Sequence, residues 1–337
     1  MTHLTSWRAH LRKSGVGLAA VAALSLVRVG SADAVLAQEG PPDGSHRVMQ
    51  LASSYQVVPN IIYRSASGVE LMLDLYQPSG LQAPNPTVLF FHLGGWTQGT
   101  KESAVMSLLP WMDMGFSILN VEYRLTNTAL APAAVEDARC ALRWVYRNQK
   151  QYNLDVTKIV TTGQSAGGHL AMMTALVPMS AGMDNTCPGD RNGNASNTGP
   201  NNTEEMKVAA IVDQYGVADV GELLAGSNMR TWAVAWLGPM SSREELAKLV
   251  SPTTYVKIGM PPLFSVHGDQ DPTVPYALKQ KFHQTLEKAG LAHELFTVPG
   301  GRHGGWSAAD NVKLYAAVRA FLTKQGVLAG AKAPASP

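Results

Sequence analysis

A serine in a glycine-flanked segment is the first feature of the sequence that could do chemistry. Ser165 is the middle residue of Gly163–Gly167 (G-Q-S-A-G), between the apolar stretch K-I-V-T-T and the helix-like stretch A-G-G-H-L-A-M-M. A strand, a tight turn and a helix in this order present a serine hydroxyl above a sheet edge. The helix N-terminus beside it favours developing negative charge. The pattern predicts Ser165 as a nucleophile; a plain glycine-rich helix cap is the alternative.

Two later segments contain the base and the acid that a serine nucleophile needs. The segment H-G-D-Q-D-P-T-V-P carries Asp269 and Asp271, and the segment G-G-R-H-G-G-W carries His303. An imidazole must take the serine proton, and a carboxylate must hold the tautomer of that imidazole and stabilise its charged form. We predict Asp271 as this carboxylate, because Asp269 lies in the turn, where it would bind local backbone N–H groups. Asp137 and Asp213 are the outside candidates.

A glycine-rich loop after another predicted strand could stabilise an oxyanion. His92–Trp96 reads H-L-G-G-W, and acyl transfer needs backbone donors aimed at the tetrahedral oxyanion. We predict the N–H groups of Gly94, Gly95 and Ala166 as these donors. An ordinary glycine turn is the alternative.

Five further side chains are candidate walls of a substrate pocket, although packing under a cap would explain each equally well. An aromatic-lined site would suit aryl, cinnamoyl or short-acyl esters. The five are Trp96, Gln164, Tyr215, Trp232 and Trp306.

The remaining histidines fit structural roles better than catalytic ones. His169 is expected in the core, His92 is expected to brace the glycine-rich loop, and His283 and His293 are expected to be exposed. The sequence contains no H-x-x-x-H motif, closely spaced cysteine pair or dense carboxylate cluster, so it predicts no metal site. No cofactor is predicted either.

The elements that must position these residues alternate along the chain. Strand-like stretches alternating with amphipathic helices predict βαβ units and a mostly parallel sheet with helices on both faces. A short turn joins the first two strands, which predicts an antiparallel hairpin. The predicted strands are Val57–Tyr63, Val69–Tyr76, Thr87–His92, Phe116–Tyr123, Lys158–Thr162, Val208–Gln214, Leu263–His267 and Glu294–Val298. The predicted helices are Ser103–Met114, Ala133–Gln151, Ala166–Leu176, Tyr276–Ala289 and Ala308–Lys324.

The first 37 residues have the pattern of an export signal. Basic residues precede the apolar run Gly15–Val27, which is too short to span a bilayer, and small residues then allow cleavage after Ala34 or Ala37. We therefore expect a secreted or periplasmic protein whose mature form has no membrane span. The remaining segments are expected to be a linker at 38–55, a catalytic domain at 56–327 with a polar loop at 178–206 and a cap-like insertion at 217–252, and a flexible tail at 328–337.

Composition excludes two broad classes of protein. Apolar residues make up 45% of the 337 residues and charged residues 15%, which permits a large core and excludes wholesale disorder. Without the four basic residues and one acidic residue of 1–37, the chain keeps 23 basic and 24 acidic residues. A nearly neutral body argues against a nucleic acid as the main partner. A small-molecule ester is the expected partner, and the oligomeric state is not predicted.

The chain has two cysteines, Cys140 and Cys187. In an oxidising compartment they could form one disulfide, which would tether the polar loop. Alternatively, Cys140 is a small buried hydrophobic residue of its helix.

Together these motifs resemble the α/β-hydrolase superfamily, and more narrowly its feruloyl-esterase-like (BD-FAE) and hormone-sensitive-lipase-like carboxylesterases. The resemblance covers roughly Val57–Gly326 and rests on H-L-G-G-W-T-Q-G-T-K, V-E-Y-R-L, D-A-R-C-A-L-R-W-V, G-Q-S-A-G-G-H-L-A and H-G-D-Q-D-P-T-V-P. It implies an α/β-hydrolase fold with a mostly parallel sheet of about eight strands, helices on both faces and a small cap insertion. The order serine, aspartate, histidine along the chain matches that fold. The resemblance implies that Ser165 is the nucleophile, Asp271 the orienting acid and His303 the base. It also implies that the oxyanion donors are the N–H groups of Gly94, Gly95 and Ala166.

One position departs from the family pattern H-G-G-G, because Leu93 replaces the first glycine. A leucine at a positive φ would be strained by roughly 1–2 kcal/mol. We therefore expect the donors at the two later glycines, and we expect Leu93 to line the pocket or the core.

The expected function is that of a secreted serine carboxylic-ester hydrolase that acts on short-acyl, aryl or cinnamoyl-type esters through an acyl-enzyme. A peptidase or amidase similar to the prolyl-oligopeptidase catalytic domain is the first alternative, and faster hydrolysis of an aminoacyl amide than of the matching nitrophenyl ester would favour it. A non-catalytic hydrolase-like binding protein is the second. Failure of a fluorophosphonate to label Ser165 in the folded protein would favour that alternative.

Overall fold

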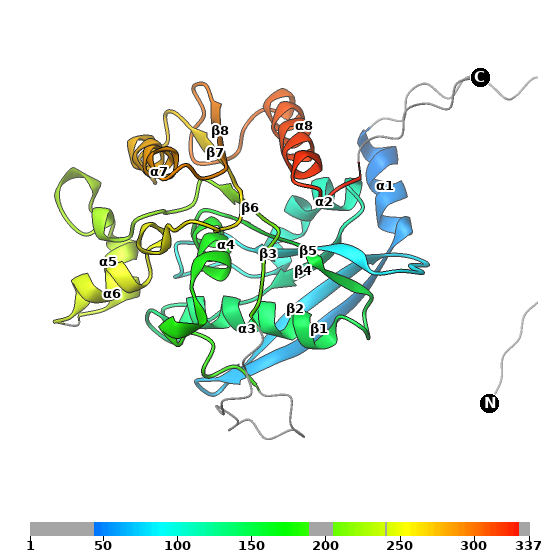
Figure 1. Ribbon diagram of the computed structural model, residues 1–337, viewed down its shortest axis with the longest axis horizontal. Helices are drawn as coiled ribbons and strands as arrows, with labels where there is room; N and C mark the ends of the chain where they lie inside the picture. Colours follow the sequence, from blue (N-terminus) through cyan, green and yellow to red (C-terminus); the bar gives the residue numbers. More distant parts are fainter. Residues whose placement is uncertain (1–43, 189–204, 240, 330–337) are drawn as a thin grey trace, which may run out of the picture. The chain divides into compact units, whose positions relative to one another are not determined.

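The computed structural model describes residues 44–188, 205–239 and 241–329 (Figure 1). The expected signal peptide at 1–37 lies outside these residues. So do the start of the expected linker, the middle of the polar loop, Met240 of the cap-like insertion and the end of the tail.

The described strands form a single eight-stranded sheet in the order β1-β2-β4-β3-β5-β6-β7-β8. The β1–β2 and β2–β4 pairs are antiparallel, and every later pair is parallel. The predictions of an opening hairpin and of a mostly parallel sheet are therefore confirmed. The strands are β1 (Tyr55–Ala66), β2 (Val69–Pro78), β3 (Asn85–Phe91), β4 (Ser117–Val121), β5 (Leu154–Gln164), β6 (Ala210–Gln214), β7 (Leu263–Gly268) and β8 (His293–Val298).

Helices cover both faces of the sheet (Figure 1). One hydrophobic cluster joins the sheet to α3 (Ala133–Asn148), α4 (Ala166–Leu176) and α7 (Tyr276–Lys288). A second cluster joins the opposite face to α1 (Gly44–Ser54), α2 (Leu109–Asp113) and α8 (Ala308–Lys324). The cap-like insertion contains α5 (Thr231–Leu237) and α6 (Arg243–Leu249). Short 3₁₀ turns are η1 (Glu102–Leu108), η2 (Met179–Ala181), η3 (Gly221–Leu223), η4 (Gly226–Asn228) and η5 (Pro252–Tyr255).

The central strand β3 shows why the strands read as continuous apolar runs. Val88 and Phe90 lie in the cluster with α2 and α8, whereas Leu89 and Phe91 lie in the cluster with α3 and α4. Successive side chains of a strand point to opposite faces, so a strand covered on both faces needs apolar residues at every position.

Two helical segments differ from the sequence-based expectation. Most of the segment expected to be a linker forms α1, and Leu51 buries its side chain in the cluster with α2 and α8. The helix predicted at Ser103–Met114 is divided into η1 and α2. Pro110 lies in the first turn of α2, where its missing N–H is tolerated.

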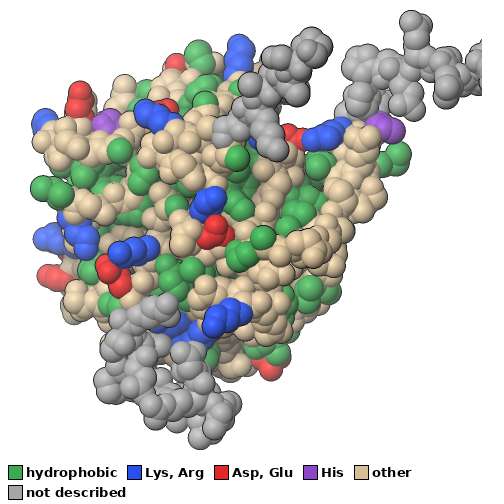
Figure 2. Space-filling view, turned by 45° about the vertical axis from the view of Figure 1, so that its right-hand side comes forward, with side chains coloured by type: hydrophobic (Ala, Val, Ile, Leu, Met, Phe, Trp, Pro, Cys, Tyr) green, Lys and Arg blue, Asp and Glu red, His purple; other side chains and the backbone are tan. Residues whose placement is uncertain are grey.

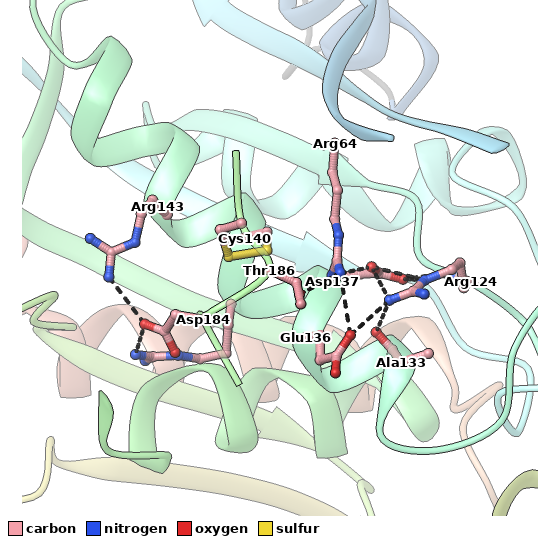
Figure 3. Close-up of a disulfide and its surroundings, with 11 residues drawn as sticks. Arg64, Arg124, Ala133, Glu136, Asp137, Cys140, Arg143, Asp184 and Thr186 are labelled. Atoms are coloured by element: carbon pink, nitrogen blue, oxygen red, sulfur yellow. Dashed lines mark hydrogen bonds and ion pairs between the residues drawn. A yellow bond between two sulfur atoms is a disulfide. The ribbon is translucent and has the colours of Figure 1, made fainter. Parts of the chain in front are cut away.

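The segment after α4 is fastened to α3 by a disulfide and by buried ion pairs (Figure 3). Cys140 of α3 is bonded to Cys187. Arg139 donates from Nη2 to Asp184 Oδ2 at 2.7 Å and from Nε to Oδ1 at 3.0 Å, and Arg143 donates to Asp184 Oδ2 at 3.1 Å. These contacts anchor the start of the expected polar loop.

A second buried ion pair lies at the carboxyl end of β6. Asp213 pairs with Lys279 of α7, and both side chains are inaccessible to solvent. Asp213 also accepts hydrogen bonds from Ser265 Oγ and from the N–H of Gly216, both at 2.8 Å. Burial alone raises the pKa of Asp213, but the Lys279 ammonium and these hydrogen bonds outweigh burial and hold the pKa below its usual range. The pair therefore fixes the turn that follows β6.

Replacing Cys140 and Cys187 together by alanine is expected to lower the free energy of unfolding by about 2–4 kcal/mol, because the bond closes a loop of 47 residues in the unfolded chain. Denaturant unfolding with and without a reductant measures this. Reductant should destabilise the wild type and leave the double variant unchanged. Equal unfolding midpoints for the oxidised and reduced wild type would contradict the stabilising role.

Lys279→Met is expected to lower the free energy of unfolding by about 3–5 kcal/mol, because it leaves the buried Asp213 carboxylate without its charged partner. Lys281→Met is the matched control on the same helix. Lys281 pairs with Glu222 at the surface, and its loss should leave stability nearly unchanged. If both variants lowered the free energy of unfolding in urea by the same amount, the buried ion pair would contribute no more to stability than the surface pair.

Candidate active site

Ser165 occupies a strained turn between β5 and α4. Its φ is 55° and its ψ is −117°, a conformation that costs about 1–3 kcal/mol and persists only where the surroundings impose it. The surroundings here are the end of β3. A Cβ on Gly167 would lie 2.0 Å from the carbonyl oxygen of Phe91, and one on Gly163 would lie 2.4 Å from the same atom. Both glycines are therefore required by the close approach of two backbones.

The structure brings the three predicted reacting side chains together. His303 Nε2 lies 2.8 Å from Ser165 Oγ, and His303 Nδ1 lies 2.7 Å from Asp271 Oδ2. Ser165 is 7% exposed and Asp271 8%. An imidazole in this position can accept the serine proton on Nε2 while its Nδ1–H donates to the carboxylate.

Hydrogen bonds from three directions hold the Asp271 carboxylate. Oδ1 accepts the N–H groups of Thr273 at 2.7 Å and Val274 at 3.0 Å. Oδ2 faces His303 and also His267 Nε2, which lies 3.1 Å away. Burial alone raises the pKa of Asp271, but the hydrogen bonds from His267, His303 and Val274 and the charge of His303 hold it well below its usual range. The carboxylate therefore stays ionised in mild acid.

His267 is a neighbour of the acid whose role sequence reasoning did not identify. The sequence placed it only at a strand end beside the turn, and its contact with Asp271 depends on how that turn folds back. The motif itself contained the signal, because His267 and Asp271 are four residues apart on either side of the turn.

The competing acids are engaged elsewhere. Asp269 accepts the N–H of Gly300 at 2.7 Å, as expected for a turn carboxylate. Asp137 is completely buried and binds Arg124 and Arg64. Asp213 binds Lys279, as described above.

The glycine-rich loop starts beside the serine turn. A Cβ on Gly167 would lie 2.6 Å from the carbonyl oxygen of His92, the first residue of the loop. Gly94 has a φ of 136° and Gly95 a φ of 59°, and within the described chain their N–H groups donate to no protein acceptor. Ala166 is the first residue of α4, so its N–H has no acceptor within the helix. All three N–H groups are therefore available to a ligand.

Leu93 causes no backbone strain in this loop. It lies outside the positive-φ region, which Trp96 enters instead with a φ of 60°. The Leu93 side chain is 46% exposed, so the expectation that it could fill the core is wrong.

Trp96 is not a pocket wall. Its side chain is inaccessible to solvent and stacks on Trp236 of α5, with ring centroids 4.0 Å apart and an interplanar angle of 12°. This stacking ties the cap-like insertion to the glycine-rich loop.

His169 contacts both indoles edge-on and is completely buried, with Nε2 2.6 Å from the carbonyl oxygen of Val250. It is a core histidine, as expected.

Tyr215 supports the candidate base rather than lining an open pocket. Its ring meets His303 edge-on at 4.8 Å and Trp306 at 5.3 Å, and only 4% of Tyr215 is exposed. Its φ of 44° places it in the turn that the Asp213–Gly216 bond fixes. The turn therefore couples the buried ion pair to the position of His303.

The other three pocket candidates retain partly exposed side chains. Trp232 faces Gly95, since a Cβ on that glycine would lie 3.5 Å from it. Gln164 and Trp306 line a groove of about 740 Å³.

Of the other histidines, His92 has the role expected of it, whereas His283 does not have the expected exposure. His92 stacks on Tyr123 at 4.2 Å and braces the glycine-rich loop. Burial lowers the pKa of His92 to about 4. His283 was expected to be exposed, but it is buried, and its Nδ1 lies 2.9 Å from His293 Nδ1.

Surface charge, possible metal ligands and helix length bear on what the protein could bind. The face in Figure 2 mixes basic, acidic and hydrophobic side chains without a dominant cluster of one charge. Within residues 44–188, 205–239 and 241–329, no set of three or more His, Cys, Asp or Glu side chains could hold a metal ion. Over the same ranges, the helices are too short or too polar to traverse a bilayer.

Comparisons with known proteins find esterases among the similar sequences and structures. Esterase LipQ of Mycobacterium tuberculosis is 29% identical over 273 residues, which cover 78% of this chain but only 61% of LipQ. Esterase Est2 of Thermogutta terrifontis superposes with a TM-score of 0.65 at 25% identity, over 83% of this chain and 95% of Est2. A truncated carbohydrate esterase from gut microbiota gives a TM-score of 0.67 at 25% identity, over 81% and 97% of the two chains.

The family model of BD-FAE matches residues 73–286. This range is more than half of the chain and runs from β2 to α7, so it includes the serine turn, the glycine-rich loop and the segment of Asp271. The chain therefore belongs to the BD-FAE family of α/β-hydrolases.

Proposed function

We propose that the protein is a serine carboxylic-ester hydrolase in which Ser165 is the nucleophile, His303 the base and Asp271 the orienting acid. The observation that carries the proposal is the unbroken pair of contacts, 2.8 Å from Ser165 Oγ to His303 Nε2 and 2.7 Å from His303 Nδ1 to Asp271 Oδ2. Membership of the family and the similarity to esterases LipQ and Est2 support an ester as the substrate.

The reaction proceeds in two halves. Ser165 Oγ attacks the ester carbonyl carbon while His303 Nε2 takes its proton, and Asp271 stabilises the imidazolium. The N–H groups of Gly94, Gly95 and Ala166 bind the resulting oxyanion, where one donor is worth about 10²–10³ in rate. The carbon–oxygen bond to the alcohol then breaks, and the alcohol leaves with the proton from His303. Water repeats the sequence on the acyl-enzyme and releases the acid.

The substrate class is a small-molecule ester with a short acyl, aryl or cinnamoyl group. The partly exposed indoles of Trp306 and Trp232 support this class, because flat apolar groups pack well against aromatic rings. The Trp306 ring contacts the Tyr215 ring, which in turn contacts His303, and Trp232 lies beside Gly95. The two indoles therefore border the base and the oxyanion loop.

We also propose that the protein is exported. The Cys140–Cys187 disulfide supports this location, since such bonds persist in oxidising compartments. Fractionation of the producing cells is expected to recover the folded, oxidised chain from the periplasm or the medium. Recovery from the cytoplasm alone would contradict export.

Ser165→Ala is expected to reduce kcat for nitrophenyl acetate by about 10⁴-fold or more, and to abolish labelling by a fluorophosphonate, because the attacking oxygen is lost. Asp271→Asn should reduce kcat by about 10⁴-fold, because the amide no longer holds the required tautomer of His303.

Asp269→Asn is the matched control for Asp271→Asn, because both acids lie in the same turn but Asp269 contacts a backbone N–H and not His303. It should change kcat by less than about tenfold, a limit set by the absence of any direct contact with the reacting groups. Hydrolysis that survives Ser165→Ala, or equal losses in the two aspartate variants, would refute the assignment.

A further inference from the structure

A groove of about 740 Å³ extends away from the candidate active site on the face of the sheet that carries α1, α2 and α8. It meets the site at Gln164, which precedes the nucleophile, and at Gly305 and Trp306, which follow the base. Ser107 Oγ donates to Gln164 Oε1 at 3.3 Å at this end. The groove therefore ends at residues that adjoin Ser165 and His303 along the chain.

The walls of the groove come from three helices that lie together in Figure 1. α8 contributes one face of its helix, from Asn311 in the first turn to Arg319. Eight residues of α-helix rise about 12 Å, which sets the length of the groove along α8. The opposite wall is η1 and α2, and α1 adds Val48 and Leu51.

Charge is confined to the far end of the groove. Asp113 of α2 accepts there from Arg47 Nε of α1 at 2.9 Å and from Arg319 Nη2 of α8 at 3.3 Å. All other lining side chains are uncharged, and most are apolar. Three apolar residues at the rim are exposed: Val48 at 38%, Met106 at 69% and Val312 at 72%. The groove is thus an apolar passage that begins beside Ser165 and ends at an ion-paired cluster.

We infer that this groove binds the extended apolar chain of the ester, and that α1 with its ion pair to Asp113 sets the limit of chain length. The inference rests on the proposed ester hydrolysis and extends it beyond short acyl groups. A volume of this size lies within the range of small-molecule sites. Because the groove ends at Gln164, next to the candidate nucleophile, its occupant is part of the substrate rather than a partner protein. With carbon–carbon bonds of about 1.52 Å, an extended chain advances about 1.25 Å per carbon, so 12 Å accommodates about ten carbons.

Chain-length series test the inference in the full chain. One series varies the acyl group of nitrophenyl esters from two to fourteen carbons, and the other varies the alkyl group of acetates over the same range. In one series kcat/KM should rise by up to about fourfold per methylene, the effect of burying a methylene group, and should stop rising near ten carbons. The series that rises identifies which half of the ester enters the groove.

Ala316→Trp should fill the groove midway along α8. It is expected to lower the ratio of kcat/KM for the eight-carbon ester to that for the two-carbon ester by at least about tenfold, the loss of a few buried methylenes. Ala320→Trp is the control, because Ala320 is also exposed on α8 but does not line the groove. It should leave the ratio unchanged.

A second pair of variants guards against misfolding. Met106→Asp puts a charge on the apolar wall and should lower the same ratio, whereas Met49→Asp, on an equally exposed methionine of α1 outside the lining, should not. Hydrolysis of acetate with flat chain-length series, or a rise that both Ala316→Trp and Met106→Asp leave intact, overturns the groove assignment alone. Wild-type protein that hydrolyses no ester in either series overturns the proposed function instead.

Discussion

The close approach of the β3 and β5 backbones at the carboxyl edge of the sheet is the constraint on which the site depends. The Phe91 carbonyl oxygen occupies the space that a Cβ would need at either Gly163 or Gly167. Because the chain must turn within this space, Ser165 is forced to a positive φ and its hydroxyl projects toward His303. The glycine-rich loop leaves β3 at the next residue, so one contact positions both the hydroxyl and the candidate oxyanion donors.

Charge is buried around this site only where it is compensated. Asp271 lies among two imidazoles and two backbone N–H groups, and Asp213 lies against Lys279 and Ser265. An isolated carboxylate at such depth would take up a proton, and an uncharged Asp271 could not stabilise an imidazolium. Hydrogen bonding therefore keeps Asp271 ionised and holds its Oδ2 against His303 Nδ1.

Two groups of helices outside the sheet shape the space around the candidate site. On one side, the stacked indoles of Trp96 and Trp236 hold the cap-like insertion against the glycine-rich loop. On the other side, α1 packs beside α2 and α8 and closes the end of the groove. The candidate reacting side chains thus lie at the sheet edge, whereas the groove and the cap-like insertion are built from helices that precede, separate and follow the strands.

Local sequence indicated the strands, the main helices and the serine turn, because apolar periodicity and glycine-flanked turns involve residues close in the chain. The alternation of apolar strands and amphipathic helices predicted eight strands, and α4 and α8 begin and end where the helical pattern predicted. G-Q-S-A-G identified its turn because only glycines fit beside the serine.

Long-range packing decided what the sequence left open or misjudged. The helix α1 was taken for a linker, since its stability comes from burying Leu51 against distant helices rather than from its own pattern. His283 was expected to be exposed, and for Trp96 a pocket wall and packing under the cap were both open. Both side chains are buried, because the elements that cover them come from other parts of the chain. The groove beside Gln164 likewise exists only where α1, η1, α2 and α8 meet, whereas the contact of His267 with Asp271 depends on how one short turn folds. Spacing along a chain specifies the type and order of elements, whereas burial and long-range contacts depend on how those elements pack in three dimensions.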